Sequence, residues 1–174
     1  MRYSNVQFVV FSGVFIALAI IFTHIFALQA TFIRIGFGFI PVAIFAAMFG
    51  PLRGACMAAV ADLIGCLIFT PGLYFPGFTL SAFCSGYIYG YFFYQKQITI
   101  PRILFATSII IVFIDLCMNT LWLSLLYNKA AMAFITARFI KSILLLPIQT
   151  TLLYTIYKPL SYYHLLRPIS KNNN

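Results

Sequence analysis

The sequence contains very little charge and almost no acid. Only 7% of its 174 residues are charged and only two are acidic, whereas about a quarter of the residues in an ordinary soluble domain are charged. Hydrophobic residues make up 63% of the chain. A soluble fold of this length could not bury so much apolar surface. The composition therefore excludes a soluble globular protein and predicts an integral membrane protein.

Several chemical signatures are also missing. The four cysteines form no CxxC pair and no cluster at metal-ligand spacing, so no metal site and no cofactor are expected. No Walker A sequence occurs, so any use of ATP must come from a partner. No internal repeat or long linker divides the chain, and we expect one transmembrane domain over residues 1–174.

The basic residues are explained by membrane topology. Eleven Lys and Arg against two acids give a net charge of +9, and most of them lie at the ends of apolar segments, without the basic stripe of a nucleic-acid site. An inside N-terminus places seven basic residues in the cytoplasm and leaves four outside: Arg34, Lys129, Arg138 and Lys141. We therefore predict a multi-pass protein of the bacterial cell membrane with both termini cytoplasmic, whose first apolar stretch is a retained helix.

The apolar segments predict an all-α bundle of about six transmembrane helices. Turn residues and polar residues separate them, with two Pro-Gly pairs in residues 70–77 and an expected kink at Pro147. Gln29, Thr31 and Arg34 mark an outer turn. The expected helices are residues 6–28, 36–49, 54–69, 78–94, 103–127 and 134–157.

Polar residues inside these helices are the candidate functional groups, because charge within a membrane usually faces the bundle interior. At 1.5 Å per residue, Asp62, Asn119 and Lys141 lie roughly 10 to 12 Å from the outer helix ends. Asp115, Asn119 and Trp122 share one helix face, as do Arg138 and Lys141. We expect these faces and Asp62 to meet in an outward-facing cavity capped by three aromatic residues: Tyr74, Phe75 and Phe78.

Structural alternatives stay open for most of these residues. Asp62 or Asp115 could instead form an intramembrane ion pair with Arg138 or Lys141, and Asp115 in particular is structural or part of the site. The aromatic residues could form a belt at the membrane interface, and Arg34 could be a topology marker rather than a site residue. Gly13 and Ala17 form a small-xxx-small pair, which allows close packing within the bundle or against a partner.

The order of several motifs resembles that of a known family. They are RIGFGFIP from Arg34, FGP at 49–51, ADLIG around Asp62, YFPGFTLSA from Tyr74, NTLWL from Asn119 and ARFIK around Arg138. With these, the chain resembles the folate-family substrate-binding subunits of energy-coupling factor (ECF) vitamin transporters. The resemblance implies a six-helix subunit that binds a vitamin from outside and then joins a separate coupling protein and two ATPases.

The resemblance also implies roles for the candidate residues. One edge of the pterin of folate carries hydrogen-bond donors, from which the Asp62 carboxylate could accept. The glutamate carboxylates of folate suit Arg34, Arg138 or Lys141. The benzoyl ring would stack on Tyr74, Phe75 or Trp122, and Phe78, Thr79 and Asn119 complete the predicted ligand site. Gly13 and Ala17 stand where the family contacts its coupling protein. Another small anionic vitamin would use the same cations.

Two other classes of function remain as alternatives. An intramembrane hydrolase would need a serine site, but Phe83 replaces the first glycine of a Gly-x-Ser-Gly motif, and neither His24 nor His164 is expected at the depth of Ser85. A stand-alone secondary carrier or a structural membrane subunit is the other alternative. A carrier usually shows paired repeats with discontinuous helices in both halves, which this sequence lacks.

Overall fold

The described residues of the computed structural model form six helical stretches and one short hairpin. They comprise residues 5–26, 28–30, 33–69, 75–127 and 131–162. The predicted all-α membrane bundle is confirmed, with helix ends that differ from the expected ones by a few residues. The helices are α1 (Asn5–Ile20) continued by η1 (Ile21–Ile25), α2 (Phe39–Phe49), α3 (Pro51–Phe69), α4 (Pro76–Phe93), α5 (Ile100–Ile109) continued by η2 (Ile110–Met118) and α6 (Asn119–Tyr127), and α7 (Ala131–Tyr162).

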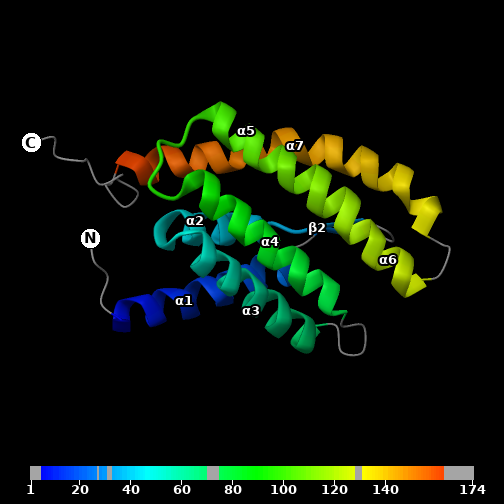
Figure 1. The fold of residues 1–174 in the computed structure, drawn as a ribbon, viewed down its shortest axis with the longest axis horizontal. Helices are drawn as coiled ribbons and strands as arrows, with labels where there is room; N and C mark the ends of the chain where they lie inside the picture. Colours follow the sequence, from blue (N-terminus) through cyan, green and yellow to red (C-terminus); the bar gives the residue numbers. More distant parts are fainter. Residues whose placement is uncertain (1–4, 27, 31–32, 70–74, 128–130, 163–174) are drawn as a thin grey trace, which may run out of the picture.

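The helices run along the long axis of the molecule, and α1 begins at the end where α7 finishes (Figure 1). We call this the near end of the bundle. Three described stretches are long and apolar enough to cross a bilayer: Asn5–Ile25, Pro51–Phe69 and Ile100–Leu125. Large apolar side chains such as Val6 (73% exposed) and Leu125 (69% exposed) point outward. Such a surface is stable only in lipid.

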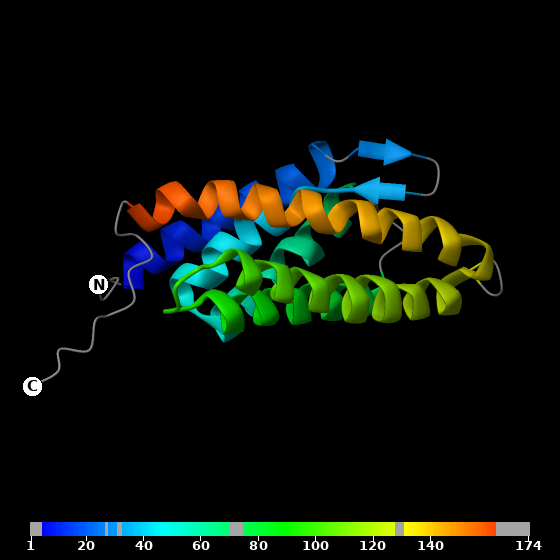
Figure 2. The same ribbon diagram turned by 90° about the horizontal axis from the view of Figure 1, so that it is seen from above.

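A short antiparallel hairpin follows the first helix, where the sequence predicted only a turn. Its strands are β1 (Leu28–Ala30) and β2 (Ile33–Ile35), with Gln29 opposite Arg34. The first helix consequently ends at Ile25, and its predicted extension to residue 28 is wrong. The hairpin lies outside the bundle, and β2 contacts α7 (Figure 2).

Glycine and proline set several helix boundaries. Gly50, between α2 and α3, has a φ of 96°, which L-residues with a side chain rarely adopt. Pro76 opens α4, where the missing N–H costs no helical hydrogen bond. By contrast, α7 remains helical through Pro147 and Pro159.

Two helices contain π-helical segments, η1 and η2. A π-turn inserts an extra residue into a helix, which changes the direction of the side chains that follow it, and such turns are frequent at functional sites. Both segments contribute polar residues to the interior, as described below.

Small residues allow α3 and α4 to pack closely. A Cβ on Gly86 would lie 2.6 Å from the carbonyl oxygen of Gly54, and a Cβ on Gly54 would lie 3.3 Å from the carbonyl oxygen of Gly86. Because the obstructing atoms at Gly86 belong to backbone, the two helices approach this closely only with glycine there.

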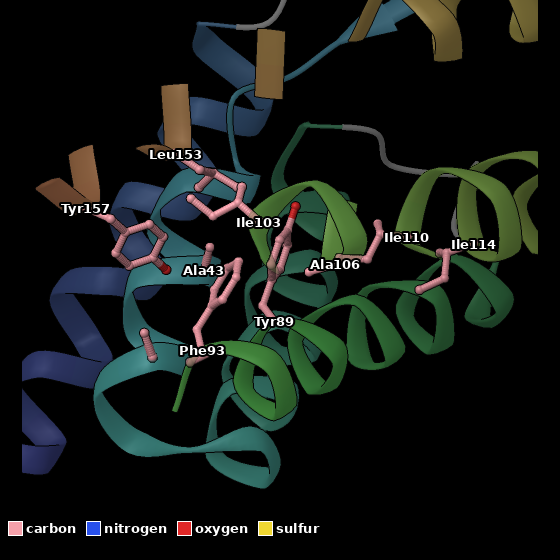
Figure 3. Close-up of a cluster of buried hydrophobic side chains, with 11 residues drawn as sticks. Ala43, Tyr89, Phe93, Ile103, Ala106, Ile110, Ile114, Leu153 and Tyr157 are labelled. Carbon is pink, nitrogen blue, oxygen red and sulfur yellow. The ribbon is translucent and has the colours of Figure 1, made fainter. Parts of the chain in front are cut away.

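Two apolar clusters hold the helices together towards the near end. The larger one brings Tyr89 and Phe93 of α4 against Ile103 of α5 and against Leu153 and Tyr157 of α7 (Figure 3). The second joins α1, α2 and α3 through phenylalanine rings, with the Phe45 and Phe49 centroids 4.6 Å apart. These clusters fix the helix positions on which the interior cavity depends.

Candidate functional site

A cavity of about 300 Å³ lies between the helices, and all six helical stretches contribute to its wall. Apolar residues such as Phe39, Val42 and Leu145 form part of the lining. The remaining lining residues include an unusual number of polar groups for the interior of a membrane bundle. The polar side chains are Thr23, His24, Asp62, Ser85, Tyr89, Asp115, Lys141 and Gln149.

Three charged residues from three helices meet at this cavity. Asp62 comes from α3, Asp115 from η2 and Lys141 from α7, and each side chain is half-buried. The structure therefore brings Asp62, Asp115 and Lys141 to one cavity, where the sequence placed them, and for Asp115 it favours the cavity position over the alternative away from it. Two carboxylates and one ammonium suit a ligand that carries both hydrogen-bond donors and an acidic group.

Each carboxylate accepts a hydrogen bond from a neighbour that does not itself line the cavity. The Thr79 hydroxyl donates to Oδ2 of Asp62 over 2.9 Å, and the Asn119 amide donates to Oδ1 of Asp115 over 3.0 Å. Such a bond fixes the orientation of the carboxylate. Thr79 and Asn119 thus hold the two carboxylates in place, and their predicted contact with a ligand stays a prediction.

Three of the predicted aromatic residues form a cluster beside the start of α4. The Phe75 centroid lies 5.6 Å from the Trp122 ring and 6.1 Å from the Phe78 ring. The indole N–H of Trp122 donates to Ser81 Oγ over 3.1 Å. We call Phe75, Phe78 and Trp122 the aromatic cluster. None of these three rings is among the described residues that line the cavity, and Tyr74, predicted to cap it, lies outside the described residues.

The predicted face of Asp115, Asn119 and Trp122 is divided between two surroundings. Asp115 lies in η2 and lines the cavity, while Trp122 lies in α6 and bonds to α4. Asp115 and Asn119 still share a face, because they form a hydrogen bond, but the spacing argument assumed an α-helix throughout, and the π-turns of η2 change the side-chain directions along it.

His24 is a cavity residue that the sequence argument missed. It belongs to η1, and its ring stacks on Phe69 with centroids 4.8 Å apart and planes 18° apart. Gly65 leaves the space that the imidazole occupies, because a Cβ there would collide with His24 Nε2. A histidine within an apolar helix was the available signal.

Tyr89 and Gln149 were also missed, and they are the most deeply buried polar residues of the lining. Tyr89 is 1% exposed and Gln149 is 7% exposed. Gln149 follows Lys141 and Leu145 on α7 at four-residue intervals, so these three side chains share one face. That spacing was visible in the sequence, but only the neighbouring helices show which face of α7 points inward.

His24 and Ser85 both line the cavity, but at different depths, as the sequence predicted: His24 contacts Gly65 of α3, whereas Gly86, next to Ser85, contacts Gly54, eleven residues earlier on that helix. The Ser85 hydroxyl donates to the carbonyl oxygen of Ser81 over 2.9 Å. Among the described residues, no group of His, Cys, Asp and Glu could hold a metal ion.

The two predicted arginines lie on neighbouring elements. Arg34 is in β2 and Arg138 is in α7, three residues before Lys141, and these two elements are in contact. Their side chains fall outside what the structure describes, so their contribution to the site stays a prediction.

The chain is similar to known proteins over most of its length. The sequence model of the family "ECF transporter, substrate-specific component" matches residues 7–157. The folate transporter FolT of Clostridium novyi (strain NT) is 41% identical over 97% of this chain and 98% of its own length. FolT of Leuconostoc mesenteroides is 32% identical over 70% of this chain and 69% of its own.

A solved structure gives the same result. A crystal structure of FolT bound with folic acid matches with a TM-score of 0.79 and 42% identity, and the match covers 84% of this chain and 88% of that one. The family model and the relatives agree with the resemblance drawn from the motifs. The chain therefore belongs to the substrate-specific components of ECF transporters.

Proposed function

We propose that this protein is the high-affinity folate-binding subunit of an ECF-type vitamin importer. It binds folate or a related pterin within the membrane and delivers it to a separate coupling protein and two ATPase subunits. The observation that carries the proposal is the cavity itself, which presents Asp62, Asp115 and Lys141 inside an apolar bundle. The FolT relatives and the folic-acid-bound FolT structure support folate as the ligand.

The chemistry of folate matches the charged groups. A cavity carboxylate, in our proposal that of Asp62, accepts hydrogen bonds from the amino group and ring N–H of the pterin. Lys141, together with Arg34 and Arg138, binds the glutamate carboxylates through charge-assisted hydrogen bonds. The aromatic cluster and Tyr74 contact the benzoyl ring where it leaves the cavity.

The outer face of α1 is the proposed contact with the coupling protein. Gly13 and Ala17 are exposed, and a Cβ on Gly13 would meet no atom within 4 Å. Three valines on the same helix are also exposed: Val6 at 73%, Val9 at 67% and Val10 at 59%. The described helices thus leave the small-residue pair uncovered, which favours a partner over packing within the bundle.

The chain is a bacterial membrane protein, and we propose that all six helices cross the bilayer as one domain with both termini in the cytoplasm. An even number of crossings returns the chain to the side where it entered. The shared position of the start of α1 and the finish of α7 supports this arrangement (Figure 2), as does the excess of Lys and Arg predicted inside.

Ligand binding by the purified protein tests the proposal. The protein is purified in detergent, small molecules that it retains are extracted and identified by mass spectrometry, and affinity is measured calorimetrically for folate and for pantothenate. We expect retained folate and tight binding of folate alone. Retention of a different vitamin, with no heat of binding for folate, would overturn the proposal.

A further inference from the structure

Two buried oxygen atoms in the cavity wall have no hydrogen-bond partner within the described part of the chain. They are Oη of Tyr89 and Oε1 of Gln149. The two residues are 1% and 7% exposed, and both line the cavity. Burial of an unpaired polar group destabilises a protein, so such groups usually have a role that the ligand-free structure does not show.

These two residues mark the inner part of the cavity. On α7, Gln149 lies eight residues beyond Lys141, or roughly 12 Å nearer the near end at 1.5 Å per residue. On α4, Tyr89 is likewise the lining residue closest to the near end, after Ala82 and Ser85. Tyr89 extends from α4 towards the interior of the bundle (Figure 3).

The surroundings of this inner part suit a flat ring. Val42, Ala58 and Ile110 supply apolar walls around the two polar side chains. A primary amide both accepts and donates, and a phenol donates through its O–H. A heteroaromatic edge with an amino group beside a ring nitrogen would satisfy the Gln149 amide, and a ring oxygen or nitrogen would accept from Tyr89.

We propose that Tyr89 and Gln149 bind the 2-amino-4-oxo heterocycle of the ligand, which enters the cavity ring first. The amino group has two hydrogens. One amino hydrogen and the adjacent ring N–H donate to a cavity carboxylate. The second amino hydrogen donates to Oε1 of Gln149. The inference rests on the proposed function. It adds two uncharged residues, Tyr89 and Gln149, to the carboxylate that binds the ring.

Two substitutions and one matched control test the protein side. Tyr89→Phe and Gln149→Leu are each expected to weaken folate binding roughly tenfold, the effect of one lost hydrogen bond. The binding of pterin alone, which has no glutamate, should weaken by the same factor. The thermal midpoint of the ligand-free protein should hold or rise, because an unpaired polar atom has been removed.

The control is Tyr157→Phe. Tyr157 is also 1% exposed with an unpartnered hydroxyl, but it packs on Phe93 and does not line the cavity. Its substitution should leave folate affinity unchanged. Unchanged affinity in Tyr89→Phe and Gln149→Leu, with folate bound normally by the wild type, would overturn the inference and leave the proposed function intact. A wild type that binds no folate would overturn both.

A ligand-side cycle tests the assignment of the amino group to Gln149. The wild type and Gln149→Leu are each titrated with folate and with 2-desaminofolate, which lacks that group. If Gln149 binds the amino group, its substitution should weaken folate binding roughly tenfold but 2-desaminofolate binding less than twofold. Equal factors for both ligands would overturn the assignment.

Discussion

Asp62 and Asp115 are carboxylates in apolar helices, where an unpaired charge has a large desolvation cost. Each accepts a hydrogen bond from a neighbour, Thr79 or Asn119, that holds it in one orientation. Lys141 lines the same cavity, so its ammonium partly neutralises their charge. The three residues are therefore suited both to bundle stability and to ligand binding, and experiments must separate the two roles.

Lys141→Met is expected to weaken folate binding roughly ten- to a hundredfold, because a charge-assisted hydrogen bond contributes about 1.5 to 3 kcal/mol. Pterin, which has no carboxylates, should lose much less affinity. The measurement is calorimetric titration of both ligands, and Arg138→Ala is expected to show the same preference.

Lys96→Met provides the control for this prediction. Lys96 is exposed, and its ammonium donates to the backbone carbonyl of Tyr91 over 2.8 Å, away from the cavity. Its substitution should change neither affinity. Equal losses for both ligands in Lys141→Met, or a fall in ligand-free stability that Asp62→Asn restores, would instead assign Lys141 a structural role.

At the scale of helices, the position of the cavity depends on how closely α3 and α4 approach. Asp62 and Thr79 lie on these two helices, and their 2.9 Å hydrogen bond requires that spacing. The glycines at the crossing permit it. A change at the crossing should therefore affect stability first and ligand binding second.

Gly86→Ala is expected to destabilise the protein by about 1 to 3 kcal/mol, the usual cost of overpacking. The added methyl would meet the Gly54 carbonyl, and backbone cannot move aside as a side chain can. The measurement is the thermal midpoint in detergent. Gly13→Ala is the matched control, since nothing lies near that position and alanine favours a helix. Equal shifts for both variants would contradict the crossing argument.

At the scale of the whole molecule, the outer face of α1 is expected to bind the coupling protein. Gly13→Leu combined with Ala17→Leu should prevent assembly with the coupling protein and ATPases, because the larger side chains block close helix approach. Folate binding by the isolated variant should be normal, since neither residue lines the cavity. Co-purification with the coupling module measures the first effect, and titration the second.

Thr151→Leu is the control for this substitution, because Thr151 is exposed on α7 and not on α1. It should assemble normally. If the Gly13 and Ala17 variant assembles and transports at the wild-type level, the outer face of α1 is not the contact with the coupling protein.

The isolated subunit is expected to bind folate but not to accumulate it. The sequence contains no Walker A motif, so we expect the energy for uptake to come from the partner ATPases. In liposomes that contain only this protein, labelled folate should bind without concentrative uptake, and adding the coupling module with ATP should start uptake. Sustained uptake against a gradient without the module would contradict the subunit function.

Composition and order along the chain were enough to predict the bilayer as solvent, the six helices and the family. The reason is that each depends on local features, namely apolar runs, turn residues and short motifs such as that from Tyr74 to Ala82. The sequence also indicated Asp62 and Lys141 as interior residues, because charge within an apolar helix has few stable locations.

The composition of the cavity wall was decided only by the tertiary structure. The π-turns that carry His24 and Asp115 change the side-chain directions that a regular α-helix would give. Whether Tyr89 and Gln149 face the cavity, and whether Gly13 faces outward, depends on the rotation of each helix against its neighbours. That rotation is set by close contacts between distant residues, as at Gly54 and Gly86, and no local pattern in a uniformly apolar helix specifies it.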